Sequence, residues 1–141
     1  MPDTITALRR ILRDCRTIAV VGVSPDWHRP SHFAAKYLQA HGYRIIPVNP
    51  RCDEVLGERC YPSLLEVPDA IDMVDVFRRP DQLHLHTAEL IAAKPRVVWY
   101  QLGIRNDVEA AKLEAAGIEV VQDRCTLADH RRLKVGAPKR E

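Results

Sequence analysis

The chain has 141 residues, the length of one domain that can bury a substantial core. Apolar residues make up 46% and charged residues 28%, which is the balance of a soluble globular protein rather than of a disordered or membrane-embedded one. The net charge of +2 is too small to indicate a nucleic-acid partner, and no apolar run is long enough to cross a membrane.

The first element in chain order is a predicted amphipathic helix over about residues 3–14. Ile5, Leu8, Ile11 and Leu12 recur at helical spacing and share one face. The segment is charged and lacks the apolar core of a signal peptide, so we expect a cytoplasmic protein.

Neither the cysteines nor the histidines have the spacing of a metal site. The four cysteines include no C-x-x-C pair, and reduced thiols are expected in the cytoplasm. His84 and His86 are two residues apart in an expected helix, so their side chains point apart. We therefore expect no metal site, and no catalytic residue stands out.

Strands and helices alternate along the rest of the chain. The five apolar segments expected to form strands are residues 17–22, 43–49, 72–77, 96–101 and 118–123. The helices expected between them are residues 32–42, capped by Ser31, 80–94, with Pro80 in the first turn, and 108–117. Residues 51–70 interrupt the alternation and are expected to hold a loop, a short extended segment and a short helix.

This alternation predicts an α/β fold. Strands joined by helices of about ten residues pair in parallel through right-handed crossovers. We therefore expect residues 1–141 to form a single doubly wound Rossmann-like domain, with a five-stranded, mainly parallel sheet flanked by helices and the strand order 3-2-1-4-5. The core is expected over about residues 15–125. The basic segment at about 130–141 is expected to be a solvated tail, with an anion-binding arm as the alternative.

The fold predicts where a ligand would bind. In doubly wound sheets, ligands sit beyond the carboxyl ends of the strands, where the strand order reverses. The residues that follow the five expected strands include turn glycines and several arginines, and the only acid among them is Asp123. The sequence therefore predicts a pocket that is rich in hydrogen-bond donors and poor in carboxylates.

The loop after the first strand, GVSPDWHRPS, departs from the fingerprint of dinucleotide-binding domains. Gly22 supplies the tight turn, but Ser24 stands at the second glycine position and the third glycine is absent. Asn49 ends the second strand, where an acid would bind the ribose of NAD. A phosphate site is still expected at the start of the next helix, where Arg29 and Ser31 would add to free backbone N–H groups.

Four stretches of the chain carry a resemblance to a known family. They are VVGVSPDWHRPSHFAAKYLQAHGYRIIPVNP, EVLGERCYPSLLEVPDAIDMVDVFRRP, VWYQLGI and GIEVVQDRC, within a similarity that runs from about residue 13 to about residue 130. The chain resembles the small CoA-binding proteins, which are single-domain relatives of the nucleotide-binding domain of the succinyl-CoA synthetase α subunit. The resemblance implies a Rossmann-like fold and coenzyme A (CoA), or an acyl-CoA, as the ligand.

The resemblance also implies a role for each matched residue. The residues implied to bind the pyrophosphate arm are Gly22, Val23, Ser24, Arg29 and Ser31. Those implied to line the adenosine side are Val48, Asn49, Pro50 and Arg51. Those implied to flank the adenine or the pantetheine arm are Phe77, Arg78 and Pro80, and those implied near the thiol end are Gln101, Gly103, Arg124 and Cys125. The ribose 3′-phosphate of CoA would explain the missing acid, because a neutral Asn49 tolerates a phosphate that a carboxylate repels.

Several of these residues have a purely structural alternative. Arg29 could pair with Asp26 at the surface, and one of Arg78 and Arg79 is expected to be solvated. Cys125 could be a small buried residue at a strand end, or a thiol that forms a mixed disulfide with CoA.

The expected function is binding of CoA or an acyl-CoA by a stand-alone nucleotide-binding domain, without catalysis by the chain alone. The related synthetase needs a further domain with a phosphorylated histidine and a β subunit, and the sequence matches neither. Two alternatives stay open. One is an NAD(P)-binding sensor or oxidoreductase with an atypical loop, and the other is a CoA-using enzyme subunit that depends on a protein partner.

Overall fold

The computed structural model describes residues 4–139, and a parallel sheet of five strands lies at its centre. The strands are β1 (Thr17–Val21), β2 (Arg44–Val48), β5 (Met73–Val76), β6 (Val97–Tyr100) and β7 (Glu119–Val121). Nearly every strand residue is buried, as expected for strands that are covered on both faces. The α/β class and the five-stranded parallel sheet are therefore confirmed.

The expected strand order was wrong. The sheet runs β2-β1-β5-β6-β7, so the third long strand pairs with β1 instead of lying outside β2. Both orders satisfy the right-handed crossover rule, and the periodicity of an apolar strand does not reveal its partners. In the observed order, the strand order therefore reverses between β1 and β5.

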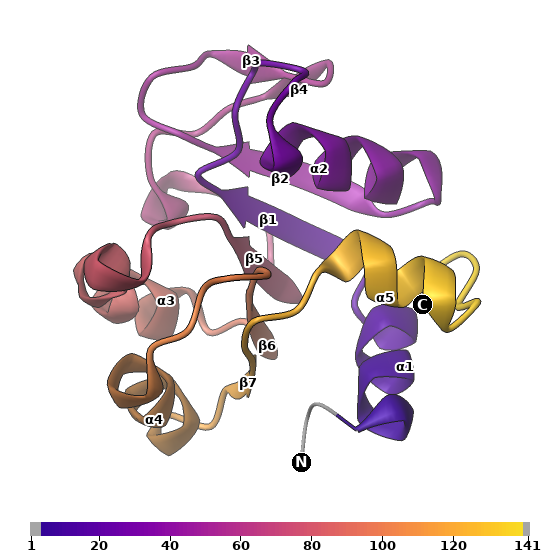
Figure 1. Ribbon diagram of the computed structural model, residues 1–141. Helices are drawn as coiled ribbons and strands as arrows, with labels where there is room; N and C mark the ends of the chain where they lie inside the picture. The colour runs from indigo at the N-terminus through magenta and orange to yellow at the C-terminus, as the bar shows by residue number, and fades with distance from the viewer. Residues whose placement is uncertain (1–3, 140–141) are drawn as a thin grey trace.

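Two layers of helices cover the sheet (Figure 1). The helices on one face are α1 (Ile5–Asp14), α2 (Pro30–Ala40) and α5 (Thr126–Arg132). Those on the other face are the 3-10 turns η1 (Leu64–Glu66) and η2 (Pro80–Leu85), with α3 (Thr87–Ala93) and α4 (Asp107–Ala115). Alternate residues of each strand pack into the two layers, giving one apolar core on each face.

The irregular segment after β2 matches its expected outline. It contains a small antiparallel hairpin, β3 (Glu54–Val55) and β4 (Glu58–Arg59), followed by η1. Leu64 of η1 packs in the core on the face opposite α2. The chain therefore crosses from β2 over β1 to β5 on that face.

The N-terminal helix packs through most of its predicted face. Leu8, Ile11 and Leu12 are buried, whereas Ile5 is 53% exposed. The Thr4 side chain caps the helix by accepting a hydrogen bond from Ala7 N at 3.2 Å. The expected start near residue 3 lies outside the described residues.

Two helix predictions need correction. Ser31 does not cap α2, because Pro30 already occupies the first helical position and Arg29 stands at the N-cap. The single helix expected over residues 80–94 is instead η2 followed by α3. A helical repeat in the sequence does not separate 3-10 from α turns, since their periods are close.

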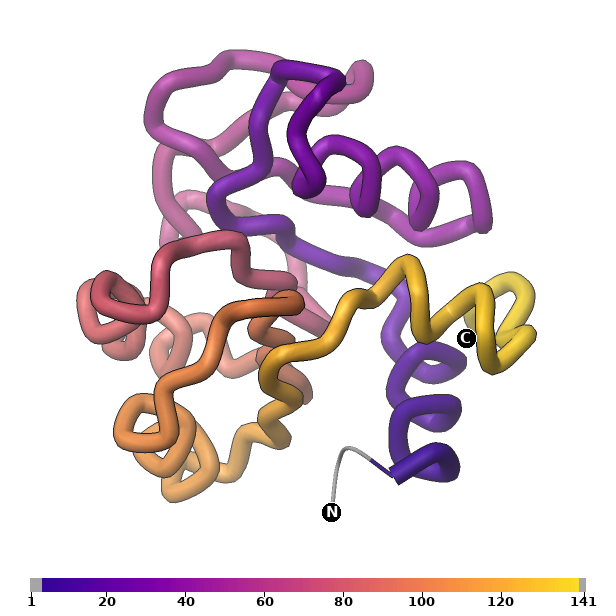
Figure 2. Tube along the Cα trace, viewed as in Figure 1, coloured from indigo at the N-terminus to yellow at the C-terminus, as the bar shows by residue number. Residues whose placement is uncertain are grey.

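The C-terminal segment is not the expected solvated tail. The first residues of this segment form the end of α5 and pack into the protein. His130 is 2% exposed, and Leu133 is buried. Lys139 N donates a hydrogen bond to Arg13 O at 2.7 Å, so the chain turns back after α5 and reaches the C-terminal end of α1 (Figure 2). The exposed arginines of α5 concealed this apolar face in the sequence, and residues 140–141 lie outside the described part. Within residues 4–139, no helix is long and apolar enough to span a bilayer.

Candidate functional site

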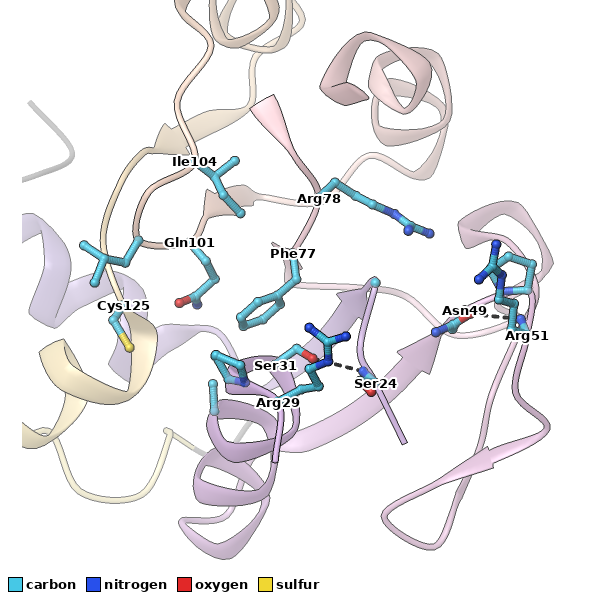
Figure 3. A pocket seen from close by; sticks show the side chains of 15 residues that line it. Ser24, Arg29, Ser31, Asn49, Arg51, Phe77, Arg78, Gln101, Ile104 and Cys125 are labelled. Atoms are coloured by element: carbon cyan, nitrogen blue, oxygen red, sulfur yellow. Dashed lines mark hydrogen bonds between the residues drawn. The ribbon is translucent and has the colours of Figure 1, made fainter. Parts of the chain in front are cut away.

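A cleft of about 820 Å³ lies beyond the carboxyl ends of β1, β2, β5 and β6. This is the edge at which the strand order reverses between β1 and β5, the usual ligand position in such sheets. Its lining residues, most of them labelled in Figure 3, are Gly22, Ser24, Arg29, Pro30, Ser31, Ala34, Asn49, Pro50, Arg51, Phe77, Arg78, Gln101, Leu102, Ile104 and Cys125.

Most of the predicted site residues meet in this cleft, and some do not. Those that line it are Gly22, Ser24, Arg29, Ser31, Asn49, Pro50, Arg51, Phe77, Arg78, Gln101 and Cys125. Those that lie outside it are Val23, Val48, Pro80, Gly103 and Arg124. The sequence reasoning missed Pro30, Ala34, Leu102 and Ile104, which are small or apolar residues with no chemical signal of their own.

The residues outside the cleft have visible structural tasks. Val23 and Val48 are buried in the two cores. Gly103 N donates to Asp123 Oδ1 at 2.6 Å in the turn after β6. The Arg124 guanidinium pairs with Asp129, with Nε 2.7 Å from Oδ2.

Gly22 makes the turn after β1 sterically possible. Its φ is +83°, and a Cβ at this position would lie 2.3 Å from the carbonyl oxygen of Phe77. Gly22 N also donates to Val48 O at 3.0 Å. A glycine is therefore required where the loops after β1, β2 and β5 meet.

The loop after β1 is held by its own short polar side chains. Ser24 N donates to Ser31 Oγ at 3.0 Å, and Asp26 N donates to Ser24 Oγ at 3.0 Å. Asp26 Oδ1 accepts from His28 N at 3.0 Å, and no ion pair joins Asp26 to Arg29 within residues 4–139. Arg29 therefore remains available to the cleft.

Asn49 ties the first two loops of the cleft together. Its Nδ2 donates to Val23 O at 2.8 Å, and its Oδ1 accepts from Arg51 N at 2.9 Å. An aspartate could not make the first of these bonds, because an ionised carboxylate has no hydrogen to donate. The structure thus gives a conformational reason for an amide at this position.

Three arginines supply the positive charge of the cleft. Arg29, Arg51 and Arg78 all line it, and none forms an ion pair with any residue in the range 4–139. Arg78 Nε is a buried atom without a hydrogen-bond partner there. The neighbouring Arg79 is exposed and pairs with Asp81 at 3.6 Å, which identifies it as the solvated member of the pair.

The start of α2 contributes less than expected. Pro30 has no N–H group, and His32 N already donates to Arg29 O at 3.0 Å. The arginine side chains, rather than a row of free backbone donors, therefore make this part of the cleft attractive to an anion.

The two ends of the cleft differ in charge. Figure 3 shows Arg78, Asn49 and Arg51 toward one end, and Gln101 and Cys125 toward the other. Leu102 and Ile104 also line the cleft, and no carboxylate from the described residues does. The arrangement suits an elongated ligand that carries its negative charge at one end.

A buried polar triad lies beneath the uncharged end. Gln101 Nε2 donates to Asp75 Oδ1 at 2.6 Å and to Thr126 Oγ1 at 2.7 Å. Thr126 Oγ1 in turn donates to Asp75 Oδ2 at 3.2 Å. Asp75 is fully buried, and burial raises its pKa to about 7, although both hydrogen bonds act in the opposite direction. An acid inside the apolar strand MVDV was the one sequence signal that could have revealed this residue.

Cys125 is half-buried and its side chain lines the cleft at the N-cap of α5. It is a free thiol. Its partial exposure differs from the alternative of a small buried residue at a strand end.

Comparisons with known proteins agree on one family. A family model described as CoA binding domain matches residues 16–131. The uncharacterized protein YneT of Bacillus subtilis is 40% identical over 123 residues, which cover 87% of this chain and 91% of that protein. The solved structure of cell-free ID.343 from Thermus thermophilus has a TM-score of 0.89 and 43% identity, and the match covers 92% of this chain and 98% of that one.

A larger protein shares the same domain. The ADP-forming acetate–CoA ligase I of Archaeoglobus fulgidus is 30% identical over 110 residues. The match covers 76% of this chain but only 16% of the ligase. The similarity therefore concerns one domain of that protein.

Proposed function

The chain belongs to the CoA binding domain family, and we propose that it binds CoA or an acyl-CoA in the cleft at the carboxyl edge of its sheet. The observation that carries this proposal is a cleft lined by three arginines that, among residues 4–139, have no ion-pair partner and no carboxylate beside them in the lining. Such a site favours a ligand with several phosphates. It disfavours NAD, whose ribose is usually held by an acid at the end of the second strand.

The charge distribution suggests how CoA would lie. Arg51 and Arg78 would take the phosphorylated adenosine end, with Asn49 neutral beside it. Arg29 and the hydroxyl groups of Ser24 and Ser31 would take the pyrophosphate. The uncharged end, with Gln101, Leu102, Ile104 and Cys125, would receive the pantetheine arm, which carries amide groups, a thiol and no charge.

We propose that this chain alone performs binding and no catalytic step. The cleft lining within residues 4–139 includes no histidine, lysine or carboxylate that could act as a general acid or base. Incubation of the purified protein with acetyl-CoA should release thiol at the rate of a protein-free control. Turnover above that control that disappears with Cys125→Ser would contradict this part of the proposal.

A thermal-shift panel tests the ligand. CoA, acetyl-CoA, NAD, NADP and ATP are compared at equal concentrations. A ligand at one hundred times its Kd should raise the free energy of unfolding by about 2.7 kcal/mol. We expect CoA or acetyl-CoA to raise the melting temperature most. A shift with NAD and none with CoA would overturn the proposal.

A further inference from the structure

While Asp75 is ionised, the side-chain amide of Gln101 has only one orientation that fits its surroundings. An ionised Asp75 accepts hydrogen bonds and cannot donate them. Its Oδ1 lies 2.6 Å from Gln101 Nε2, so a flipped amide would press the Gln101 oxygen against a carboxylate oxygen. The one hydroxyl hydrogen of Thr126 is used on Asp75 Oδ2. The triad therefore keeps both N–H groups of Gln101 turned into the protein.

This leaves a single polar atom of Gln101 for the cleft. Gln101 Oε1 takes no hydrogen bond from any of residues 4–139, while the side chain lines the cleft and is only 3% exposed. An acceptor with no partner at the bottom of a cleft favours a ligand that brings a donor to that point. The surrounding lining is otherwise poor in polar groups, since Leu102 and Ile104 are apolar.

We propose that Gln101 is a specificity-determining residue, and that Asp75 and Thr126 hold its amide so that Oε1 accepts a hydrogen bond from the uncharged arm of the ligand. The inference rests on the proposed function, because the pantetheine arm of CoA offers amide N–H groups and a thiol S–H in this region. Asp75 is a positioning residue that acts through Gln101. The triad thereby adds affinity for the arm without affecting recognition of the phosphates.

Calorimetric titration at pH 8, above the pKa of about 7 of Asp75, tests this division. The probes are CoA, acetyl-CoA and adenosine 3′,5′-bisphosphate, which is a nucleotide fragment of CoA without the arm. Gln101→Met keeps the side-chain length and removes the acceptor. We expect its Kd for CoA to rise about fivefold, the size of one neutral hydrogen bond, with the Kd for the bisphosphate unchanged.

Thr87→Val is a matched control on the opposite face of the sheet. Thr87 is also a buried threonine whose Oγ1 donates to a buried carboxylate, Glu109 Oε1 at 2.6 Å. Thr126→Val and Thr87→Val should both lower the melting temperature. Only Thr126→Val should weaken CoA binding, because Thr126 contacts Gln101 and Thr87 does not.

Substitutions of Asp75 separate positioning from simple stability. Asp75→Leu removes the carboxylate that orients the Gln101 amide, and it should weaken CoA binding as Gln101→Met does. Asp75→Asn should recover most of that affinity, since its amide oxygen still accepts from Gln101 Nε2 and its N–H groups can donate to Thr126 Oγ1. Where Gln101→Met alone does not fold, the double variant with Asp75→Leu replaces both partners by apolar groups of similar shape and carries the same test.

The outcomes are distinct. If Gln101→Met weakens binding of CoA but not of acetyl-CoA, the donor is the thiol. If it weakens binding of both equally, the donor is an amide N–H. Either result supports the inference. Unchanged CoA binding by Gln101→Met, or an equal loss for the bisphosphate, would overturn it. Failure of the proposed function looks different, because the wild-type protein would then bind neither CoA nor the bisphosphate.

Discussion

At the scale of single residues, Asn49 and Gly22 show that geometry and charge act together at this site. Asn49 donates to the loop after β1 and accepts from the loop after β2, so its amide fixes their spacing. Gly22 lets the same loops approach the end of β5. Both residues shape the cleft that the arginines then make positive.

Asn49→Asp should weaken CoA binding for two reasons. The carboxylate loses the hydrogen bond to Val23 O and faces that carbonyl oxygen, which should lower the free energy of unfolding by about 1–3 kcal/mol. It also places a negative charge at the end proposed for the phosphorylated ribose. Asn49→Ala removes the same hydrogen bonds without adding charge. Calorimetry should therefore give a larger Kd for Asn49→Asp than for Asn49→Ala, and equal values would remove the electrostatic argument.

Arg78 and Arg79 form a natural pair for testing the positive end. Arg78 lines the cleft without an ion pair inside residues 4–139, whereas Arg79 is exposed beside Asp81. Arg78→Gln should raise the Kd for CoA at least tenfold, because a charge-assisted hydrogen bond contributes about 1.5–3 kcal/mol. Arg79→Gln should leave it within about twofold. Similar losses for both variants would indicate a diffuse attraction rather than a phosphate contact.

At the scale of elements, β5 carries an acid where its neighbours carry apolar residues. Asp75 pairs in register with Val20 of β1 and Trp99 of β6, at the centre of the sheet. Gln101 and Thr126 alone bond its carboxylate among residues 4–139, and they come from the end of β6 and the start of α5. The triad thus fixes how α5 meets the cleft edge of the sheet.

Asp75→Asn should stabilise the protein in a pH-dependent way. Burial raises the pKa of Asp75 to about 7 from 3.8, so the folded state holds a proton that the unfolded state has lost between these values. Stability from this group is full below about pH 4 and is lost as pH rises through about 7. At pH 8 the free energy of unfolding of the variant should therefore exceed that of the wild type by on the order of 4 kcal/mol, and the two values should match near pH 4. Urea unfolding at both pH values measures this, with the exposed Asp81→Asn as control. A constant difference between Asp75→Asn and the wild type would contradict the assignment.

At the scale of the whole molecule, His130 joins the C-terminal segment to the helical layer that contains α2 and α5. Its Nδ1 is 2.9 Å from Tyr37 Oη, and its Nε2 is 2.6 Å from Gly136 O, while the rings of His41 and Tyr43 pack around it. These contacts join α2, α5 and the following segment. The basic composition of this region concealed a packed element.

His130 should make the protein less stable in mild acid. Burial lowers its pKa, and His41 lowers it further, while the bond to Gly136 O opposes them. Near pH 6.5 the imidazole therefore binds a proton in the unfolded state but stays neutral in the folded state. The free energy of unfolding then falls as the pH drops below that value. His130→Gln should flatten this fall between pH 7 and pH 5 in melting experiments, whereas the exposed His84→Gln should not. Asp75 acts in the opposite direction over this range, so the comparison is made in the Asp75→Asn background. An unaltered slope in His130→Gln would contradict the assignment.

The sequence predicted the fold class and the edge at which the cleft lies, because strand and helix periodicities and turn glycines are local signals. It did not predict the position of β5 or the packing of His130, since both depend on contacts between distant segments. The same limit explains the site. Arg29 and Asn49 were recognisable from their loops, but Arg124 lies outside the cleft, where it pairs with Asp129 in the first turn of α5. Asp75 was missed because only the folded sheet brings it under Gln101.

We propose that the carboxyl edge of this sheet holds CoA with its phosphates among the arginines and its arm toward Gln101. The most direct measurement is a crystal structure of the protein grown with CoA. We predict the phosphorylated ribose beside Arg51 and Arg78, the pyrophosphate beside Arg29 and Ser31, and the pantetheine arm over Gln101. An empty cleft at saturating CoA, or a coenzyme bound in the reverse direction, would contradict the account.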